Sequence, residues 1–291
     1  MNDYPLISLI LATKGRDKEV EEFLDSLLTQ TYKNFEIIIV DQNPDNRIEK
    51  IIQKGKYEDL KILHLRSSPG LSKARNTGLR HTSGDIVGFP DDDCRYPPTL
   101  LEHVVTFFLN HPEFGGVSGK IRNQSGQSPI GHLDKKSGRI TLYNVWKRGV
   151  STAIFLRREV VLKVGYFDED LGVGAKTKWQ SGEETDYLIR AIKKGFNLYY
   201  DPGIEVYHPL PFYKSISSQR AYGYGGGMGR VLYKHKFPLW FVFLSILNGV
   251  FGIILGIILL NMPMIKFYIY NTKGRLLEYL SNLGDSPATS G

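Results

Sequence analysis

Cysteine is nearly absent from this sequence, which has one, Cys94, among 291 residues. A single thiol cannot close a disulfide within the chain or build a cysteine-ligated zinc site, and it suits a reducing compartment such as the cytoplasm. Because 42% of the residues are hydrophobic and 12% are aromatic, the composition excludes a disordered, collagen-like or coiled-coil protein. The length suits one globular domain with an appendage, or two small domains.

The sequence also lacks several motifs that define common active sites. It contains no phosphate-binding P-loop, no nucleophile-elbow serine and no zinc-binding helix with paired histidines. The glycine-rich run 223–229 has the wrong spacing for a dinucleotide site and follows no predicted strand. Its two pairs of glycines, Gly223 with Gly227 and Gly225 with Gly229, instead predict a small-residue face for close helix packing.

Positive charge is unevenly distributed along the chain. From Val206 to the last residue there are eight Lys and Arg against two acidic residues, an excess of six out of a net charge of +7. The preceding 205 residues are nearly neutral, with 29 basic and 28 acidic residues. A basic excess at one end indicates an anionic partner, such as a membrane surface or a nucleic acid, or else a solvated basic tail.

A long apolar segment favours the membrane among these alternatives. Residues 237–265 contain no Asp, Glu, Lys or Arg. As a helix, the 22 residues 239–260 would extend about 33 Å, and a hydrocarbon core is about 30 Å thick. Trp240 and Tyr268 stand near its ends, where interfacial aromatic residues are common. We therefore expect membrane association rather than a buried core helix, and no nucleic-acid partner. A single span and a shallow hairpin bent at 248–249 both stay open.

The first two-thirds of the chain alternates strand and helix patterns. Apolar runs of strand length are separated by segments with apolar residues at three- and four-residue intervals. This order predicts βαβ units and an α/β fold with a mostly parallel central sheet. We expect strands at 6–12, 35–41, 60–65, 85–89, 115–120, 152–157, 197–201 and 204–207, helices at 20–28, 47–53, 71–80, 97–110 and 184–194, and a polar loop at 122–138.

The same patterns indicate where the chain divides. We expect a catalytic α/β domain over residues 1–210, a basic interfacial helix over 211–237, a hydrophobic membrane segment over 238–265 and a C-terminal tail over 266–291. The interfacial helix is expected because residues 213–235 mix aromatic and aliphatic side chains with Lys and Arg, a composition that suits the headgroup region of a membrane.

Acidic residues follow two of the expected strands. Asp41 closes the second strand, and Asp91, Asp92 and Asp93 follow the fourth. In open parallel sheets, ligands bind beyond the carboxyl ends of the strands. Three adjacent carboxylates repel one another unless a cation neutralises them, and their oxygen atoms suit Mg²⁺ or Mn²⁺ bound together with a substrate phosphate. A solvated acidic loop is the alternative.

Two further groups could take part in chemistry. Glu183, Glu184 and Asp186 open an expected helix, where acids interact favourably with the helix dipole. Three acids within four positions exceed what capping requires, so one of them could serve as a general base. His208 ends a short strand, either as a hydrogen-bonded structural residue or as a ligand.

The order of these motifs resembles that of the family-2 glycosyltransferases, from residue 5 to residue 209. The resemblance is carried by motifs at 9–13 with Arg16, 26–32, 35–41, 70–78, 84–86, 91–93, 151–155, 165–169 and 182–190. It implies a Rossmann-like, nucleotide-sugar-binding α/β fold with an Asp-x-Asp metal motif. It also implies inverting transfer from a nucleotide-diphosphate sugar, with Mn²⁺ or Mg²⁺ as the cofactor.

The resemblance implies roles for individual positions. The positions around the nucleotide sugar are Thr13, Arg16, Asp41, Arg75, Asn76, Asp91 and Asp92, and those at the metal are Asp93 and His208. Within this set, Asp41 is expected to face the base of the nucleotide. The family places its catalytic base in a Gly-Glu-Asp-x-Asp pattern, whose first Asp aligns with Glu184, so Glu184 or Glu183 is the expected base. Trp179 and Asp186 are expected on the acceptor side.

The sequence therefore predicts a membrane-associated glycosyltransferase whose catalytic domain faces the cytoplasm. Its acceptor would be a saccharide or a lipid-linked acceptor, in polysaccharide or glycoconjugate biosynthesis. A nucleotidyltransferase, a membrane-tethered nucleotide- or saccharide-binding module and an RNA-binding protein are the competing hypotheses. The donor sugar, the linkage and the oligomeric state are left open by the sequence.

Overall fold

A computed structural model describes residues 4–123, 126, 134–209 and 213–284. The chain divides into two compact units. Unit 1 consists of residues 1–69, 73–167 and 187–210, and unit 2 consists of residues 70–72, 168–186 and 211–291. One division falls at 210/211, where we expected the α/β domain to end. The segments 70–72 and 168–186 belong to the same unit as the C-terminal helices, which the sequence did not indicate.

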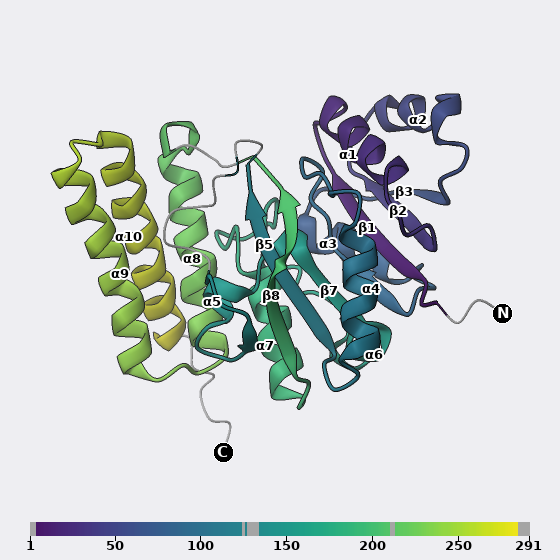
Figure 1. Cartoon of the computed structure of the whole chain (residues 1–291). Helices are drawn as coiled ribbons and strands as arrows, with labels where there is room; N and C mark the ends of the chain where they lie inside the picture. The colour runs from purple at the N-terminus through teal and green to yellow at the C-terminus, as the bar shows by residue number, and fades with distance from the viewer. Residues whose placement is uncertain (1–3, 124–125, 127–133, 210–212, 285–291) are drawn as a thin grey trace, which may run out of the picture. The chain divides into compact units, whose positions relative to one another are not determined.

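Unit 1 contains one eight-stranded sheet with the strand order β3-β2-β1-β4-β7-β5-β8-β6 (Figure 1). Parallel ladders join β3, β2, β1 and β4 in that order and join β5 to β8. β7 is antiparallel to both β4 and β5, and β6 is antiparallel to β8. This mixed, mostly parallel sheet confirms the expected α/β fold class. The strands are β1 (Ile7–Thr13), β2 (Phe35–Asp41), β3 (Ile62–Arg66), β4 (Ile86–Gly88), β5 (Gly116–Arg122), β6 (Gly138–Ile140), β7 (Ile154–Arg157) and β8 (Leu198–Tyr207).

The helices of this unit pack on the sheet and thereby bury their apolar faces. All seven residues of β1 are buried, as expected for a parallel strand packed on both faces. In α1 (Lys18–Leu28), the side chain of Asp17 accepts the first backbone N–H, and the apolar face of the helix is buried. The other helices ahead of β8 are α2 (Arg47–Ile52), α3 (Leu71–Leu79), α4 (Leu100–Asn110), α5 (Val145–Arg148), α6 (Arg158–Val164) and α7 (Glu183–Lys193), with 3₁₀ turns η1 (Gly55–Tyr57) and η2 (Ser151–Ala153). The first residues of α3 and α7 belong to unit 2.

Three features of unit 1 differ from the expected pattern. The strands expected at 197–201 and 204–207 form one strand, β8, in which residues 201–204 bulge opposite Gly119 of β5 before pairing resumes at Glu205. A Cβ at Gly119 would lie 2.0 Å from the carbonyl oxygen of Ile204, so the close approach requires glycine. β6 and α6 were not expected, since three and seven residues are too short for a clear period. Most of the expected loop 122–138 lies outside the described residues.

Unit 2 is built on three helices, α8 (Ser218–Lys234), α9 (Leu239–Ile258) and α10 (Met262–Gly284), preceded by the turn η3 (Tyr213–Ser215). α10 packs against both α8 and α9 (Figure 1). A Cβ at Gly225 of α8 would lie 1.8 Å from the carbonyl oxygen of Asn271, and one at Gly229 would lie 2.3 Å from that of Arg275. The expected small-residue face is therefore confirmed for Gly225 and Gly229, which let the two helix backbones approach closely. Gly223 and Gly227 instead pack against residues 178–181, which are not helical.

The C-terminal part differs from the expectation in three respects. The apolar residues Ala221, Val231 and Leu232 of α8 are buried, so this helix packs within unit 2 instead of presenting an apolar face to a membrane. α9 runs unbroken through 248–249, so a hairpin bent there is wrong, and the chain reverses between α9 and α10. Residues 266–284 belong to α10 and not to a tail, because α10 has α8 and α9 to pack against. Residues 285–291 lie outside the described part.

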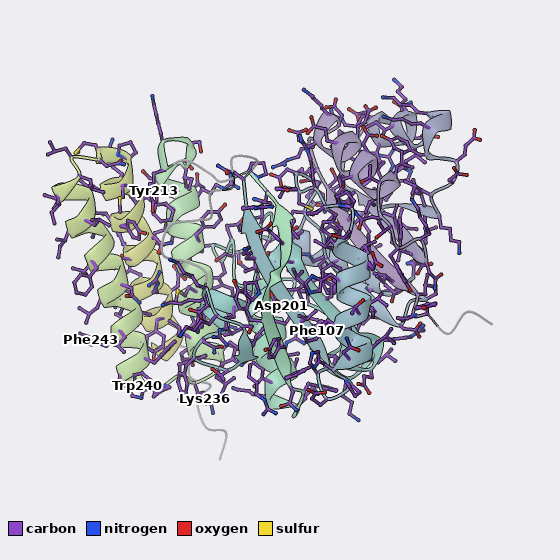
Figure 2. The ribbon with its side chains drawn as sticks, viewed as in Figure 1. Phe107, Asp201, Tyr213, Lys236, Trp240 and Phe243 are labelled. Atoms are coloured by element: carbon purple, nitrogen blue, oxygen red, sulfur yellow. The ribbon has the colours of Figure 1, made fainter. Side chains whose placement is uncertain are left out.

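Among the described residues, α9 is the one helix long and apolar enough to cross a membrane, with a mean hydropathy of 2.5. Only 28% of its most apolar window is buried in the protein. Figure 2 shows the side chains of Trp240 and Phe243 on this helix, and they are 54% and 60% exposed. The exposed apolar surface of unit 2 thus lies mainly on α9 and continues onto α10.

Gly225→Ala tests the contact between α8 and α10. Alanine favours helices by about 1 kcal/mol over glycine, but the added methyl group would overlap the backbone of α10. We expect a net loss of about 1–3 kcal/mol in the free energy of unfolding, as for overpacked sites, measured by urea denaturation. Gly55→Ala is the control, because a Cβ there meets only Glu58 Oε1 at 3.5 Å, and we expect it to be neutral or slightly stabilising. Equal stability of both variants would contradict the close packing.

Candidate active site

The acidic triplet lies in a turn directly after β4, at the carboxyl ends of the parallel strands. Asp91 forms a β-bridge with Ala12 of β1, and Arg95, just beyond the turn, forms a bridge with Tyr207 of β8. The last residue of β1, Thr13, donates its hydroxyl to Asp92 Oδ2 at 2.8 Å. The sheet therefore fixes the triplet where such folds bind ligands.

Two arginines compensate part of the negative charge of the triplet. Arg16, in the loop after β1, places Nη1 2.5 Å from Asp93 Oδ2 and Nε 3.4 Å from Asp92 Oδ1. Arg75 of α3 is 1% exposed, and its Nη2 lies 3.3 Å from Asp91 Oδ1 and 3.1 Å from the hydroxyl of Ser151. Both guanidinium groups reach the carboxylates from elements that are distant in sequence.

His208 completes the cluster from the residue after β8. Its Nε2 lies 3.1 Å from Asp93 Oδ1 and 3.7 Å from Asp91 Oδ2. The structure thus brings together seven of the residues expected in the site, namely Thr13, Arg16, Arg75, Asp91, Asp92, Asp93 and His208.

The neighbouring carboxyl groups have different acidities. Burial raises the pKa of Asp92 to about 6, and it outweighs the opposing effects of Arg16 and Thr13. Burial acts in the same direction on Asp93, but the hydrogen bonds and charges of His208 and Arg16 prevail and lower its pKa to about 2. Burial disfavours the charged form of His208, yet the contact with Asp93 and the charge of Asp91 raise its pKa. Asp93 therefore stays anionic well below neutral pH, whereas Asp92 takes up a proton as the pH falls towards 6.

The donors around Asp93 fit a divalent cation only in part. Carboxylate oxygens from Asp91 and Asp93 and the imidazole of His208 are ligands that Mn²⁺ accepts, and the carboxylates also suit Mg²⁺. However, within the described part of the chain no three His, Cys, Asp or Glu side chains converge on one metal position. Such a set suits an ion that takes its remaining ligands from the phosphates of a substrate.

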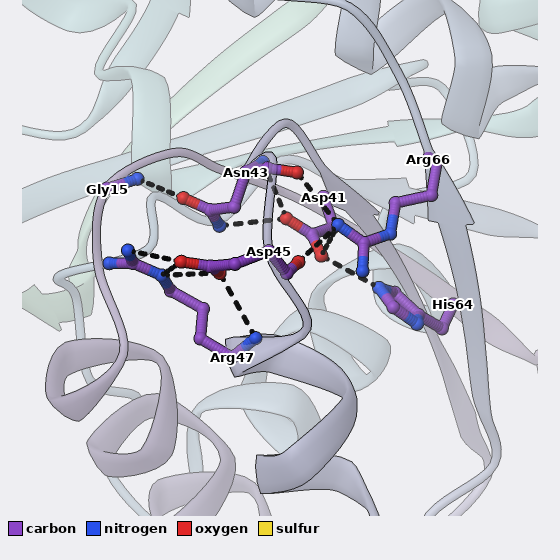
Figure 3. Close-up of polar contacts among 7 residues, drawn as sticks. All are labelled: Gly15, Asp41, Asn43, Asp45, Arg47, His64 and Arg66. Carbon is purple, nitrogen blue, oxygen red and sulfur yellow. Dashed lines mark hydrogen bonds and ion pairs between the residues drawn. The ribbon is translucent and has the colours of Figure 1, made fainter.

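Asp41 lies in a separate network at the end of β2 (Figure 3). Its buried carboxylate accepts hydrogen bonds from the backbone and side-chain nitrogens of Asn43, each at 2.8 Å. His64 Nε2 at 3.1 Å and Arg66 Nη1 at 3.0 Å contact its other oxygen. The Asn43 side chain in turn accepts the backbone N–H of Gly15 at 2.5 Å. Asp41 thereby ties the loops after β1 and β2 to β3.

Asn76 has a supporting position. It is 2% exposed, and both groups of its side-chain amide bind the backbone of Phe167, with N–H···O distances of 3.0 and 2.7 Å. The Arg75 guanidinium lies over the ring of the same Phe167, 5.5 Å from its centroid. Asn76 therefore positions the element next to Arg75, and its expected contact with a nucleotide sugar stays a prediction.

The two candidate bases stand at the start of α7, in the part that belongs to unit 2. Glu183 is 3% exposed and lies against Gly172, where a Cβ would be 2.9 Å from its carboxyl carbon. Gly172 also has a φ of +102°, so both the close contact with Glu183 and the backbone conformation require glycine there. Glu184 is only half-buried. Of the two carboxylates, Glu184 is the one that an incoming hydroxyl group could approach.

The expected acceptor-side residues are both engaged within unit 2. Trp179 donates its indole N–H to Glu278 Oε2 of α10 at 3.2 Å, and the guanidinium of Arg230 lies 4.4 Å from the centroid of its ring. Asp186 is fully buried, with Lys234 Nζ and His235 Nε2 at 2.7 and 2.8 Å from Oδ1. Because its carboxylate is directed to these cations, Asp186 anchors the start of α7 to the end of α8 and is not open to an acceptor.

Sequence reasoning missed several residues of these networks. Asn43, His64, Arg66 and Ser151 support Asp41 and Arg75. His64 and Arg66 alternate along β3, beside β2, a polar spacing that could have identified them. Glu278 accepts hydrogen bonds from Trp179, from Lys178 at 2.9 Å and from Tyr222 at 2.6 Å. Glu278 is one of two acidic residues after Val206, and this rarity could have identified it in the sequence.

A model of the family Glycosyl transferase family 2 matches residues 8–165 of the chain. The chain belongs to this family. The resemblance noted in the sequence is therefore confirmed.

The relatives of this family-2 glycosyltransferase bear related names. An uncharacterized glycosyltransferase of Haemophilus influenzae is 26% identical over 196 residues, which cover 65% of this chain and 63% of that protein. Glycosyltransferase AglE of Haloferax volcanii is 24% identical over 273 residues, which cover 91% and 84%. The poly-beta-1,6-N-acetyl-D-glucosamine synthase of Staphylococcus epidermidis is 29% identical over 179 residues, which cover 57% and 42%. The chain thus spans less than two thirds of the Haemophilus and Staphylococcus proteins.

Solved structures share the fold of this family-2 glycosyltransferase. Mannosyltransferase PcManGT from Pyrobaculum calidifontis, in complex with GDP-Man and Mn²⁺, has a TM-score of 0.64 and 17% identity, with 97% of this chain and 88% of that chain covered. TarS of S. aureus has a TM-score of 0.61 and 17% identity, with 94% and 54% covered. At these identities the likeness supports the architecture, a mixed and mostly parallel α/β sheet.

Glu278→Gln tests the network that holds Trp179. Burial raises the pKa of Glu278, but hydrogen bonds from Tyr222, Lys178 and Trp179 prevail and hold it below the usual 4.5. A depressed carboxyl pKa stabilises the fold above the unfolded pKa, and this contribution is lost as the pH falls through the folded pKa. We expect the variant to lose about 1–3 kcal/mol of unfolding free energy at neutral pH, measured in urea.

The loss should shrink as the pH falls below the ordinary carboxyl pKa, because wild-type Glu278 then becomes protonated as well. Lys178→Gln is the matched control, since the lysine side chain is 66% exposed and its ion pair should contribute less. A loss that does not change with pH, or a larger loss for the lysine variant, would contradict this assignment.

Proposed function

We propose that the protein is an inverting, metal-dependent glycosyltransferase that moves a sugar from a nucleotide-diphosphate donor to a hydroxyl group of a saccharide or lipid-linked acceptor. The observation that carries the proposal is the convergence of Asp91, Asp92 and Asp93 with two arginines and His208 beyond the ends of β1 and β4. The family membership supports the reaction class. The polysaccharide synthase among the relatives supports a role in polysaccharide or glycoconjugate biosynthesis.

Anion binding is the first task of such a site. Arg16 and Arg75 present guanidinium groups, which match phosphate oxygens in geometry and charge. The network of Asp41, Asn43 and Gly15 holds the loop that carries Arg16. PcManGT, solved with GDP-Man, and residues 1–349 of S. aureus TarS, solved with UDP, support a nucleotide-sugar donor for this chain as well.

Charge develops on the diphosphate as it leaves the sugar. A bound divalent cation would neutralise that charge, and Asp93 would hold it with help from Asp91 and His208. Arg16 contacts Asp92 and Asp93 together, so it orients the same carboxylates and adds positive charge beside the phosphates. Mn²⁺ in the PcManGT complex supports this cofactor class.

The acceptor needs a base because a sugar hydroxyl is a weak acid. Glu184 would accept the hydroxyl proton while the acceptor oxygen bonds to the anomeric carbon and the carbon–phosphate oxygen bond breaks. A single in-line displacement of this kind inverts the anomeric centre, and no covalent enzyme intermediate is needed. Glu183, buried against Gly172, would orient the start of α7 instead.

We also propose that unit 2 attaches the enzyme to a membrane, with the catalytic domain on the cytoplasmic side. The exposed apolar face of α9 supports attachment. Its neighbour α10 carries Lys273, Arg275 and Glu278, and Arg275 donates a hydrogen bond to the carbonyl oxygen of Ser245 in α9. If α9 crossed the bilayer, these charges would have to enter it alongside, which is costly. A position along the membrane surface, with α9 in the apolar boundary, avoids that cost.

The metal assignment has a direct test. Incubation with a panel of nucleotide sugars, Mn²⁺ and a saccharide acceptor should release nucleoside diphosphate for at least one donor. We expect EDTA to abolish this release and Asp93→Asn to lower it about 10²-fold or more. Because His208 and Arg16 lower the pKa of Asp93, the variant should also unfold at a lower temperature, so activities are compared at a temperature at which both proteins are folded. Asp59→Asn, an exposed carboxylate elsewhere in unit 1, should retain full activity. Turnover that survives both EDTA and Asp93→Asn would refute the metal assignment.

The base assignment is tested by two neighbouring variants. Glu184→Gln should lower the rate of transfer by about 10²–10⁴-fold and leave nucleotide-sugar affinity nearly unchanged. Glu183→Gln should mainly lower stability, because its carboxyl group is buried. Donor binding by calorimetry and single-turnover transfer separate the two effects. If Glu183→Gln is inactive but stable while Glu184→Gln transfers normally, the base has been assigned to the wrong residue.

A further inference from the structure

A basic pocket lies at the end of unit 2 where α10 begins. It has a volume of about 300 Å³ and is lined from two sides, by the segment around η3 and by the first turns of α10. Lys214 and Lys266 stand on opposite sides of it, both exposed. Among the described residues neither lysine forms an ion pair, so both ammonium groups are available to an anion.

The walls of the pocket are held in place by aromatic contacts. The hydroxyl groups of Tyr213 and Tyr268 are 3.2 Å apart, and the ring of Tyr213 lies 5.2 Å from that of Phe267. These contacts hold η3 on α10 and thereby hold the backbone positions of the two lysines on the two sides of the pocket. Asn261 caps α10 by accepting the backbone N–H of Met264 at 3.1 Å, so the positive end of a 23-residue helix also faces this region.

The chain next to the pocket is strongly apolar and exposed. We call residues 257–262 the apolar tip, because it includes Ile258, Leu260 and Met262, which are 70%, 87% and 59% exposed. Water is a poor solvent for such a group of side chains, and exposed patches of this kind mark interaction sites. The apolar tip is continuous with the exposed face of α9.

We propose that this pocket binds the phosphate group of an anionic membrane lipid, with Lys214 and Lys266 on the phosphate and the apolar tip among the acyl chains. In a membrane lipid, a phosphate group lies next to the acyl chains. In the protein, the two lysines of the pocket lie next to the apolar tip, so both parts of the lipid meet a matching surface. The volume is sufficient for a headgroup phosphate with its glycerol. A free phosphate would satisfy the lysines but would leave the apolar tip in water. The inference rests on the proposed membrane association and is independent of the transfer reaction.

Vesicle flotation with the full-length protein tests the pocket. The vesicles contain phosphatidylcholine alone, phosphatidylcholine with phosphatidylglycerol, or phosphatidylcholine with oleate at the same surface charge. We expect binding to be tightest with phosphatidylglycerol. Because each lysine near an anionic surface contributes about 1 kcal/mol, or about fivefold in affinity, Lys214→Gln with Lys266→Gln should weaken that binding about tenfold or more.

Lys273→Gln is the matched control, since it removes one charge from the exposed side of α10 about 10 Å from Lys266 along the helix. At physiological ionic strength this exceeds the screening length of about 8 Å, so we expect little change. Lys266→Arg should retain binding, because it keeps the charge.

Each other outcome overturns the inference in a distinct way. A loss for Lys273→Gln equal to that for Lys266→Gln alone, or equal binding to the oleate vesicles, would show diffuse attraction and no phosphate pocket. Displacement of the protein from vesicles by millimolar inorganic phosphate would identify a free phosphate as the occupant. Binding to all vesicles alike would overturn the pocket and leave membrane association intact. Binding to none would overturn both, while release of nucleoside diphosphate would still test the transferase proposal separately.

Discussion

The site depends on the compensation of three adjacent carboxylates. Asp91, Asp92 and Asp93 repel one another, and the turn that carries them is stable only where cations are close. Arg16, Arg75 and His208 supply that charge from the loop after β1, from α3 and from the end of β8. Since these elements meet at the edge of the assembled sheet, the arrangement of the site depends on the complete fold of unit 1.

The parts of the fold that were predictable from sequence are those with a strong local pattern. β1 and β2 are continuous apolar runs, and their observed bounds agree with the expected ones to within one residue. Asp41 and the acidic triplet were found because they follow such strands directly. The position of β7, antiparallel between β4 and β5, was not predictable, since strand order is set by packing between distant segments. The contact of Trp179 with Glu278 was not predictable for the same reason, because the two residues are about 100 positions apart in the sequence.

The helices of unit 2 pack through glycine residues and enclose charged side chains. Glycines at 225, 229 and 274 remove side chains where α8 and α10 meet, so the contact relies on backbone proximity. This arrangement leaves polar residues such as Arg275 and Glu278 inside a predominantly apolar layer, where each has hydrogen-bond partners in a neighbouring segment. The sequence indicated the glycine face correctly, but the partner helix was taken for a tail because its apolar pattern is weak.

The contact between Glu278 and Trp179 has a practical consequence for anyone who wishes to make this enzyme soluble. The segment 168–186, which carries Glu183 and Glu184, shares one compact unit with α8, α9 and α10. Trimming the chain ahead of α9 would expose the glycine face of α8 and remove the acceptor of the Trp179 and Lys178 hydrogen bonds. The apolar helix α9 therefore cannot be removed as if it were a separate membrane anchor. Solubility has to be sought by replacing outward-facing residues of α9, such as Phe243 and Phe251, with polar ones.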